Sequence, residues 1–536
     1  RPTPARLRRA LAACPVALVG VPPLHREGRA APAGLAAADA AVAAAARATG
    51  DGVLLVVGLS ETGRSQAHLH VAVAAGGSFT GGELSSGSTG RPPFVQLVDV
   101  APTVLALRGV PQPAAMTGRP WRATAHRANG QPALPTVVAG LRDDEVAAQA
   151  VRGALPWFLG ILIGLQLVGY AVAGLLARRG DHRAGAVATG TALAAAGGPV
   201  GSYVAQLTHW WRAPVPVAAV AATSIAVAVA LAALAWAGPW RREPLGPPAV
   251  VAGVTALILA ADVVTGSRLQ MSSVFGYSPL VAGRFAGFGN VAYGVFAAAA
   301  LLAATGLAAA LLPGRGRRTA GVAVLAVGLA AIAVDGAPRW GSDFGGVLAL
   351  GPAVGLLAMW VAGLRVTWRR IALAAGLSLV AVVAFALLDY ARAPQAQTHL
   401  GRFAGQVLHG GAWPVMRRKA KANLHLLVRT PVNAVVPFAT AYLGWLVARP
   451  RGRLAAAIRW RPVLGSGLGA VVVMSAIGFL VNDSGDAVPA MAMLVAIPFA
   501  IAVIGRSPAA GTASGRHAGH RGEKRASADP ESPVLP

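Results

Sequence analysis

Residues 276–290, with the sequence GYSPLVAGRFAGFGN, lie between two long apolar runs and do not resemble an ordinary membrane loop. The segment is rich in glycine, has two phenylalanines in its GRFAGFGN core and contains one arginine, Arg284. We interpret it as a packed re-entrant or surface segment at the mouth of a helical membrane bundle. The apolar runs on either side then belong to that bundle.

The composition favours a membrane protein over a soluble one. Hydrophobic residues make up 55% of the chain and charged residues only 12%, with a mean hydropathy of +0.58. The predicted fold is mainly α, a polytopic helical membrane bundle of about eleven spans, because each apolar run has about the length that a bilayer core requires. The runs are residues 155–177, 185–206, 215–237, 248–265, 289–312, 319–335, 345–364, 371–390, 431–448, 463–481 and 487–505.

Basic residues predict how these spans are oriented. Arginine clusters follow the odd-numbered runs, for example at Arg178 and Arg179, at Arg241 and Arg242, and at residues 315–318. Because basic loops stay in the cytoplasm, residues 1–153 are expected outside a bacterial plasma membrane and the C-terminus inside. The formal charge of +27 then reflects loop arginines and not a nucleic-acid partner, so the expected partner is the lipid bilayer.

Three regions follow from this pattern. Residues 1–153 form an extracytoplasmic domain, residues 154–506 the transmembrane bundle, and residues 507–536 a disordered basic cytoplasmic tail. Because the chain opens with Arg1 and has no leader before an external domain, we expect it to be a fragment. The only cysteine, Cys14, excludes a disulfide framework.

Within the first region, patterns of strand and helix alternate. Residues 36–48 predict a helix, residues 52–58 a buried parallel strand, and residues 68–75 a second strand, which together favour a partial α/β domain. Residues 143–145, Asp-Asp-Glu, are expected to be a polar linker or a solvated helix start before the first span.

The block VQLVDVAPTVLALRGV, residues 95–110, followed by residues 118–121, resembles the C-terminal part of the alkaline phosphatase superfamily. The resemblance covers roughly residues 51–121 and implies a truncated phosphatase-like domain. Enzymes of that superfamily hold two metal ions with an Asp-His pair, where this chain has Ser-Glu-Thr-Gly at residues 60–63. Glu61, His68 and His70 remain as candidate metal ligands, with strand histidines at a sheet end as the alternative. The metal motif is degenerate, because Thr62 stands in place of the histidine. The domain is also truncated, because the first fifty residues contain no candidate for the nucleophile of the superfamily.

Six acidic residues fall on the outer side of the predicted bundle: Asp262, Asp335, Asp343, Asp389, Asp483 and Asp486. Ionisable groups at the ends of spans are functional candidates because they are costly to desolvate. The alternative is that the outer loops are simply polar and their aspartates cap helices. The candidate catalytic residues are Asp262, Asp343, Asp483 and His399, and the candidate substrate-binding residues are Arg284, Arg402, Arg339, Asn290 and Asn482.

Arg284 and Arg402 each occur in Gly-Arg-Phe, which suits two clamps on one anionic ligand. A divalent cation is the candidate cofactor, because it would neutralise such a carboxylate cluster. Residues 413–427 predict either a basic interfacial helix suited to a polyprenyl phosphate or anionic lipid, or a helix packed over the bundle.

Three functions fit these patterns. The first is an envelope enzyme acting at the outer leaflet on a lipid-linked or phosphate-bearing glycan. The second is a non-catalytic scaffold with a degenerate phosphatase-like domain, and the third is a transporter or flippase, for which charges near mid-span are almost absent. The membrane motifs also resemble an uncharacterised family of bacterial envelope proteins with a phosphatase-like domain ahead of the bundle, which implies architecture but no activity.

Overall fold

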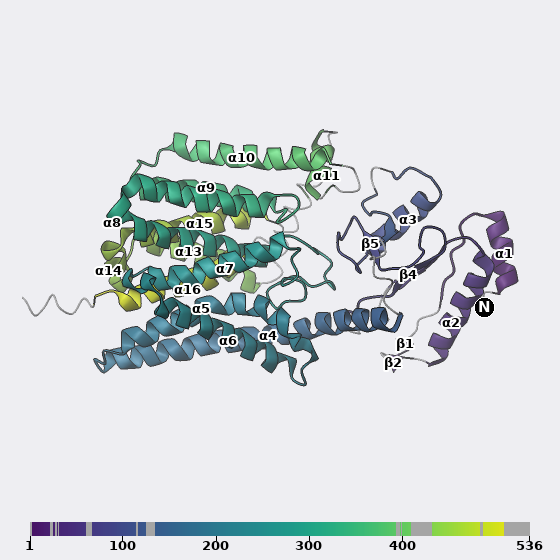
Figure 1. Cartoon of the computed structure of the whole chain (residues 1–536), viewed down its shortest axis with the longest axis horizontal. Coiled ribbons are helices and arrows are strands. Elements are labelled where there is room, and N and C mark those ends of the chain that lie inside the picture. Colours follow the sequence, from purple (N-terminus) through teal and green to yellow (C-terminus); the bar gives the residue numbers. More distant parts are fainter. Residues whose placement is uncertain are drawn as a thin grey trace, which may run out of the picture.

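The computed structural model describes residues 3–21, 25–26, 29–30, 32–59, 67–113, 116–124, 134–392, 397, 399–408, 417, 431–482 and 486–508. Figure 1 shows an N-terminal domain at one end of the long axis and a bundle of roughly parallel helices at the other. Helix α4 (Leu134–Arg178) runs from one to the other and has 45 residues. Its length of about 67 Å is roughly twice the ~30 Å hydrocarbon core of a bilayer. Its polar first part therefore stands outside the apolar layer.

The N-terminal domain combines short helices with short strands. The helical elements are α1 (Pro4–Ala13), α2 (Pro32–Thr49), the 3₁₀ helix η1 (Leu97–Asp99) and α3 (Val100–Leu107). The strands are β1 (His25–Arg26), β2 (Arg29–Ala30), β3 (Leu54–Val57), β4 (Ala72–Ala75), β5 (Leu84–Ser86) and β6 (Trp121–Ala123). Among the described residues they form three antiparallel pairs, β1–β2, β3–β4 and β5–β6.

The prediction of a buried parallel strand at residues 52–58 is wrong in its pairing and burial. Strand β3 pairs antiparallel with β4, with Leu54 opposite Ala75, and all four residues of β3 are only half-buried. A continuous apolar run is typical of strands covered on both faces, but this hairpin has too few neighbours to be covered in that way. The predicted helix at residues 36–48 does lie within α2.

Asp99, in the block that resembles phosphatases, joins β5 and the residues after it to the segment before β6. Its side chain is fully buried and accepts hydrogen bonds from Ser86 Oγ at 2.7 Å and Ser88 Oγ at 2.5 Å. The backbone N–H groups of Gln96 and Arg119 donate to the same carboxylate, each at 2.9 Å. These four donors satisfy the carboxylate with hydrogen bonds, and the contacts tie η1 to the segments on both sides.

The bundle is built from long apolar helices. They are α5 (Ala184–Val204), α6 (Pro216–Ala237), α7 (Gly246–Val264), α8 (Asn290–Gly336), α9 (Phe344–Ala362), α10 (Trp368–Tyr390), α13 (Pro431–Ala448), α15 (Pro462–Val481) and α16 (Ala487–Arg506), with α4 beside them and the shorter α11 (His399–Leu408) and α14 (Gly452–Trp460). Short 3₁₀ helices η2 (Ala205–Thr208), η3 (Trp210–Arg212) and η4 (Pro239–Arg242) connect them.

Among the described residues, eight helices are long and apolar enough to cross a membrane, which supports a multi-pass membrane protein. The eleven predicted runs coincide with helices of the bundle, and two of them fall in α8, which is interrupted at Gly316 (φ 75°, ψ 175°). In the apolar section of α8, 72% of the residues are buried, whereas in those of α4 and α10 only 6% are buried. Helix α8 is therefore central, and α4 and α10 are peripheral.

Residues 265–289, between α7 and α8, form a packed layer of irregular chain at the mouth of the bundle. Tyr203 donates its hydroxyl hydrogen to the Phe275 carbonyl oxygen at 2.7 Å, and Gln206 Nε2 donates to the Ser272 carbonyl oxygen at 2.9 Å. Phe288 is fully buried. This loop layer matches the interpretation of residues 276–290 as a packed segment at the bundle mouth.

Candidate functional site

The candidate site surrounds Asp335, in the last turn of α8. Its side chain is fully buried, and neither carboxylate oxygen has a hydrogen-bond partner among the described residues. Asp343, the N-cap residue of α9, is 5% exposed and lies close enough for the two charges to interact. The N–H of Asp343 donates to the Asp335 carbonyl oxygen at 3.0 Å. Two carboxyl groups therefore share one buried corner of the bundle, which we call the Asp335 corner.

Two successive glycines in the first turn of α9 leave room at this corner. A Cβ on Gly346 would lie 2.2 Å from Asp335 Oδ2, and a Cβ on Gly345 would lie 2.0 Å from Asn482 Oδ1. Both distances are far below van der Waals contact, so any larger residue would displace the polar side chains. The Asn482 amide and the Asp335 carboxylate thus approach neighbouring residues of the α9 backbone.

Arg284 and Tyr293 complete the surroundings of Asp335. Arg284 Nη1 donates to the Gly341 carbonyl oxygen at 3.1 Å, and its charge acts on Asp335. The buried Tyr293 donates its hydroxyl hydrogen to the Gly346 carbonyl oxygen at 2.9 Å. An ionised buried carboxylate without hydrogen bonds is strongly destabilising unless a positive charge neutralises it. The corner is therefore suited to bind a cation or to exchange a proton.

The donor set at this corner fits a cation that a ligand helps to hold. No three His, Cys, Asp or Glu side chains are grouped as a metal site in the part of the chain that the structure describes. Asp335 and Asp343 can supply two carboxylates, and Asn482 can supply an amide oxygen. Mg²⁺ is often bound through one or two protein carboxylates, with water and substrate phosphate completing its shell.

Asp262 and Asp389, at the ends of α7 and α10, make structural contacts with the loops that follow. Asp262 Oδ1 accepts a hydrogen bond from the N–H of Leu269 at 2.7 Å. Asp389 accepts one from the N–H of Gly401 at 2.8 Å and pairs with Arg392 at 2.9 Å. These tertiary contacts offset the unfavourable helix dipole. Asp262 was predicted to be catalytic, and the structure shows that it also has a structural role in the loop after α7.

The two Gly-Arg-Phe arginines have different surroundings. Arg284 belongs to the Asp335 corner. Arg402 lies in α11, where burial lowers its pKa and nearby Arg119 lowers it further, while Asp389 and Asp99 favour the charge. The repeated motif thus places one arginine beside Asp335 and the other between α10 and the N-terminal domain.

The other predicted residues are distributed around this end of the bundle. Asn290 begins α8 and is half-buried, and Arg339 is exposed in the loop between α8 and α9. His399 begins α11. His70 packs against Gly58, where a Cβ would lie 2.8 Å from the His70 Cβ. Several predictions lie outside the described residues, namely Glu61, Asp483, the helix at residues 413–427 except Arg417, and residues 509–536 of the tail.

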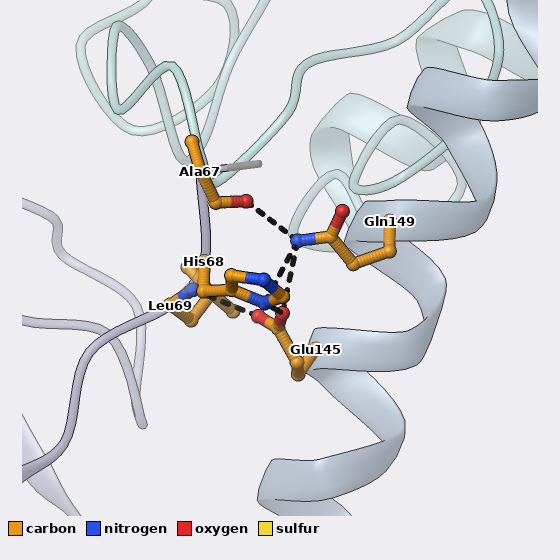
Figure 2. A network of polar contacts seen from close by, with 5 residues as sticks. All are labelled: Ala67, His68, Leu69, Glu145 and Gln149. Carbon is orange, nitrogen blue, oxygen red and sulfur yellow. Dashed lines mark hydrogen bonds and ion pairs between the residues drawn. The ribbon is translucent and has the colours of Figure 1, made fainter. Parts of the chain in front are cut away.

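His68, a predicted metal candidate, docks the N-terminal domain on α4 (Figure 2). Its Nδ1 lies 2.5 Å from Glu145 Oε1, and the N–H of Leu69 donates to Glu145 Oε2 at 2.8 Å. One turn further along α4, Gln149 Nε2 donates to the Ala67 carbonyl oxygen at 2.6 Å. The carboxylate that approaches His68 thus belongs to the helix that leads into the membrane.

Arg91 is a second docking residue, which the sequence patterns did not single out. Its Nη1 donates to the carbonyl oxygens of Ser267 at 3.0 Å and Phe285 at 3.2 Å. The ring of Phe94 lies 5.6 Å from that of Phe285, centroid to centroid. The sequence feature that could have pointed to Arg91 is Gly90-Arg91-Pro92, which is another Gly-Arg turn. Through these contacts the N-terminal domain covers the loop layer.

Comparisons with protein-family models, with curated proteins and with solved structures found no match. The resemblance of residues 95–110 to the alkaline phosphatase superfamily is therefore still a hypothesis.

Proposed function

We propose that this chain is an integral membrane protein of a bacterial envelope that acts on a phosphate-bearing, lipid-linked substrate. The observation that carries the proposal is the Asp335 carboxylate, which is buried beside Asp343 and has no hydrogen bond among the described residues. In the proposed site Asp335 and Asp343 would hold a divalent cation, which would supply positive charge for the substrate phosphate. Arg284 offsets the remaining negative charge.

The proposal places the N-terminal domain outside the plasma membrane and the C-terminus in the cytoplasm, after eleven crossings. This orientation is supported by contacts between basic loops that lie away from the N-terminal domain. Arg461 pairs with Glu243 at 3.1 Å, and Arg506 donates to the Arg241 carbonyl oxygen. Both contacts join loops that the positive-inside rule assigns to the cytoplasm. The Asp335 corner then belongs to the outer leaflet.

A non-catalytic scaffold is the second candidate, and the surroundings of Asp99 favour it. This carboxylate belongs to the phosphatase-like block, and four structural donors already occupy it. In that case the N-terminal domain is a cover for the loop layer, held by Arg91, and turns over no substrate itself.

The test is Mg²⁺-dependent binding of a radiolabelled polyprenyl phosphate to the full chain in phosphatidylcholine nanodiscs. Wild-type protein is expected to bind at least about tenfold more tightly with Mg²⁺ than with EDTA, a difference of about 1.4 kcal/mol. Asp335→Asn and Asp343→Asn keep the side-chain shape and are expected to lose this difference. Asp181→Asn, in a predicted cytoplasmic loop, is the matched control and should keep it. An equal Mg²⁺ response in all four proteins would overturn the proposal, and no Mg²⁺ response in wild type would favour the scaffold.

A further inference from the structure

The loop between α8 and α9 also lines a hollow that is separate from the Asp335 corner. Asp343, at the end of this loop, lies beside Asp335. Arg339 and Trp340, in its middle, line a hollow of about 350 Å³. The hollow is completed by Ala337, Pro338 and, from the end of α10, Leu388 and Arg392. One short loop therefore joins the buried carboxylates to an open, arginine-lined hollow.

The charges at the hollow are predominantly positive. Arg339 is exposed, and Arg392 is oriented by its ion pair with the buried Asp389, at 2.9 Å between Nη1 and Oδ1. Asp389 also accepts the N–H of Gly401, so its negative charge is shared with the backbone. Two guanidinium groups thus line the hollow, and the one on Arg392 is paired with the Asp389 carboxylate. Guanidinium groups are planar forks of donors that match the oxygens of a phosphate.

The apolar walls of the hollow continue onto a surface that faces lipid. Leu388 is 64% exposed and Trp340 is 38% exposed. The apolar section of α10 is only 6% buried, so most of its side chains are available to acyl chains in a bilayer. Tryptophan at the end of a span is typical of the headgroup region. A ligand in the hollow would therefore have its charge on arginine and its apolar part along α10.

We propose that this hollow binds the phosphate of an anionic lipid headgroup, with an acyl chain lying along α10. A free phosphate would use the arginines but gain nothing from Leu388 or from the exposed face of α10. The inference rests on the proposed function only for the role of the lipid, because a lipid held here would bring its headgroup to the loop that carries Asp343.

The experiment measures retention of phosphatidylglycerol by the full chain with native mass spectrometry, against phosphatidylcholine as the zwitterionic reference. Wild type is expected to prefer phosphatidylglycerol, and Arg339→Ala should weaken that binding about tenfold, the worth of one charge-assisted hydrogen bond. Arg268→Ala removes an exposed arginine from the loop that follows α7 and is the matched control, expected to bind as wild type. Trp340→Leu should weaken binding without changing the charge.

Two further measurements distinguish a lipid headgroup from a free phosphate, and this inference from the proposed function. Glycerol 3-phosphate should compete only at concentrations at least about a hundredfold above those of the lipid, because it has no acyl chain. Equal effects of Arg339→Ala and Arg268→Ala, no preference for phosphatidylglycerol, or competition by glycerol 3-phosphate at lipid concentrations would overturn the inference. Asp335→Asn should keep lipid retention while losing the Mg²⁺ response, so either proposal can fail alone.

Discussion

At the residue scale, Asp144 and Glu145 are neighbours in the polar part of α4, before its apolar run, but respond differently to burial. Burial, with a further contribution from Asp143, raises the pKa of Asp144 to about 6. Burial also opposes ionisation of Glu145, but hydrogen bonds from Leu69 N–H, Gln149 and His68 outweigh it and lower the pKa of Glu145. When ionised, Asp144 therefore weakens the docked structure and Glu145 strengthens it.

Asp144→Asn is expected to stabilise the protein by about 1 kcal/mol at pH 8, because water still partly screens this carboxylate. Its folded pKa lies above the ordinary value of 3.8. The penalty of ionisation is thus absent below about pH 4, grows between about pH 4 and 6, and is complete above that range. Arg91 reduces the penalty and Glu83 increases it. Thermal unfolding in detergent should show a larger gain at pH 8 than at pH 5.

The matched control for this substitution is Asp143→Asn. Asp143 accepts hydrogen bonds from Arg212 Nε at 2.6 Å and Trp211 Nε1 at 3.1 Å, so its charge is favourable where it lies. Asp143→Asn should not stabilise the protein at either pH. A loss of stability in Asp144→Asn at pH 8 would contradict the proposed effect of burial.

Glu145→Gln tests the docking contact at His68. Because the folded pKa of Glu145 is lowered, its contribution is present above about pH 4.5 and is lost as the pH falls through the lowered value. At pH 7 the substitution should speed hydrogen exchange of the Leu69 amide about tenfold, since that N–H donates to the carboxylate. Glu83→Gln, at an exposed residue of the same domain, should leave the rate unchanged. An unchanged rate in Glu145→Gln would show that the contact does not hold the domain.

The sequence could not place these carboxyl groups, because hydropathy marks where lipid begins and not where a helix begins. Residues 143–145 were expected in a linker or at a helix start, yet α4 already begins at Leu134. The role of Asp335 could not be predicted from the sequence either. Its position at a span end was visible, but the gap left by Gly345 and Gly346 and the approach of Asn482 depend on how α8, α9 and α15 pack.

At the element scale, the loop layer of residues 265–289 is held from two sides and stores strain. The bundle holds it through Tyr203 and Gln206, and the N-terminal domain through Arg91. Among the described residues, every non-glycine residue with positive φ lies in a loop at this end of the bundle: His209, Ser267, Ser272, Ala282 and Ser342. Each such residue costs about 1–3 kcal/mol and persists only where its surroundings impose it.

Arg91→Ala is expected to loosen the loop layer from the outside. Burial lowers the pKa of Arg91, but Tyr277 and Asp262 favour its charge, and its three carbonyl acceptors at Gly266, Ser267 and Phe285 require an N–H donor. Hydrogen exchange of residues 266–285 should become at least tenfold faster. Arg91→Lys should restore part of the protection, because lysine keeps the charge without the planar fork.

The matched control is Arg108→Ala, which removes an exposed arginine after α3 in the same domain. It should leave exchange in residues 266–285 as in wild type. Full protection of the loop layer in Arg91→Ala would mean that the bundle alone imposes its conformation.

At the scale of the whole molecule, the bundle could be predicted from sequence because bilayer thickness sets the length of an apolar run. Each predicted run coincides with a helix, but which helices are neighbours could not be predicted from a one-dimensional pattern. The prediction that Arg284 and Arg402 clamp one anionic ligand was a hypothesis of this kind. The structure instead brings Asp335, Asp343 and Arg284 together and places Arg402 beside Asp389.

The predicted orientation can be tested on the intact molecule, because Cys14 is the only cysteine and can be replaced by alanine. In that background Arg108→Cys, in the N-terminal domain, should react with a membrane-impermeant maleimide in intact cells. Ser514→Cys, in the C-terminal tail, should react only after the cells are permeabilised. The reason is that basic loops follow the odd-numbered spans, and an odd number of crossings puts the two ends on opposite sides. The reverse labelling pattern would overturn the orientation. Labelling of both cysteines in intact cells would require an even number of crossings, which eleven spans cannot provide.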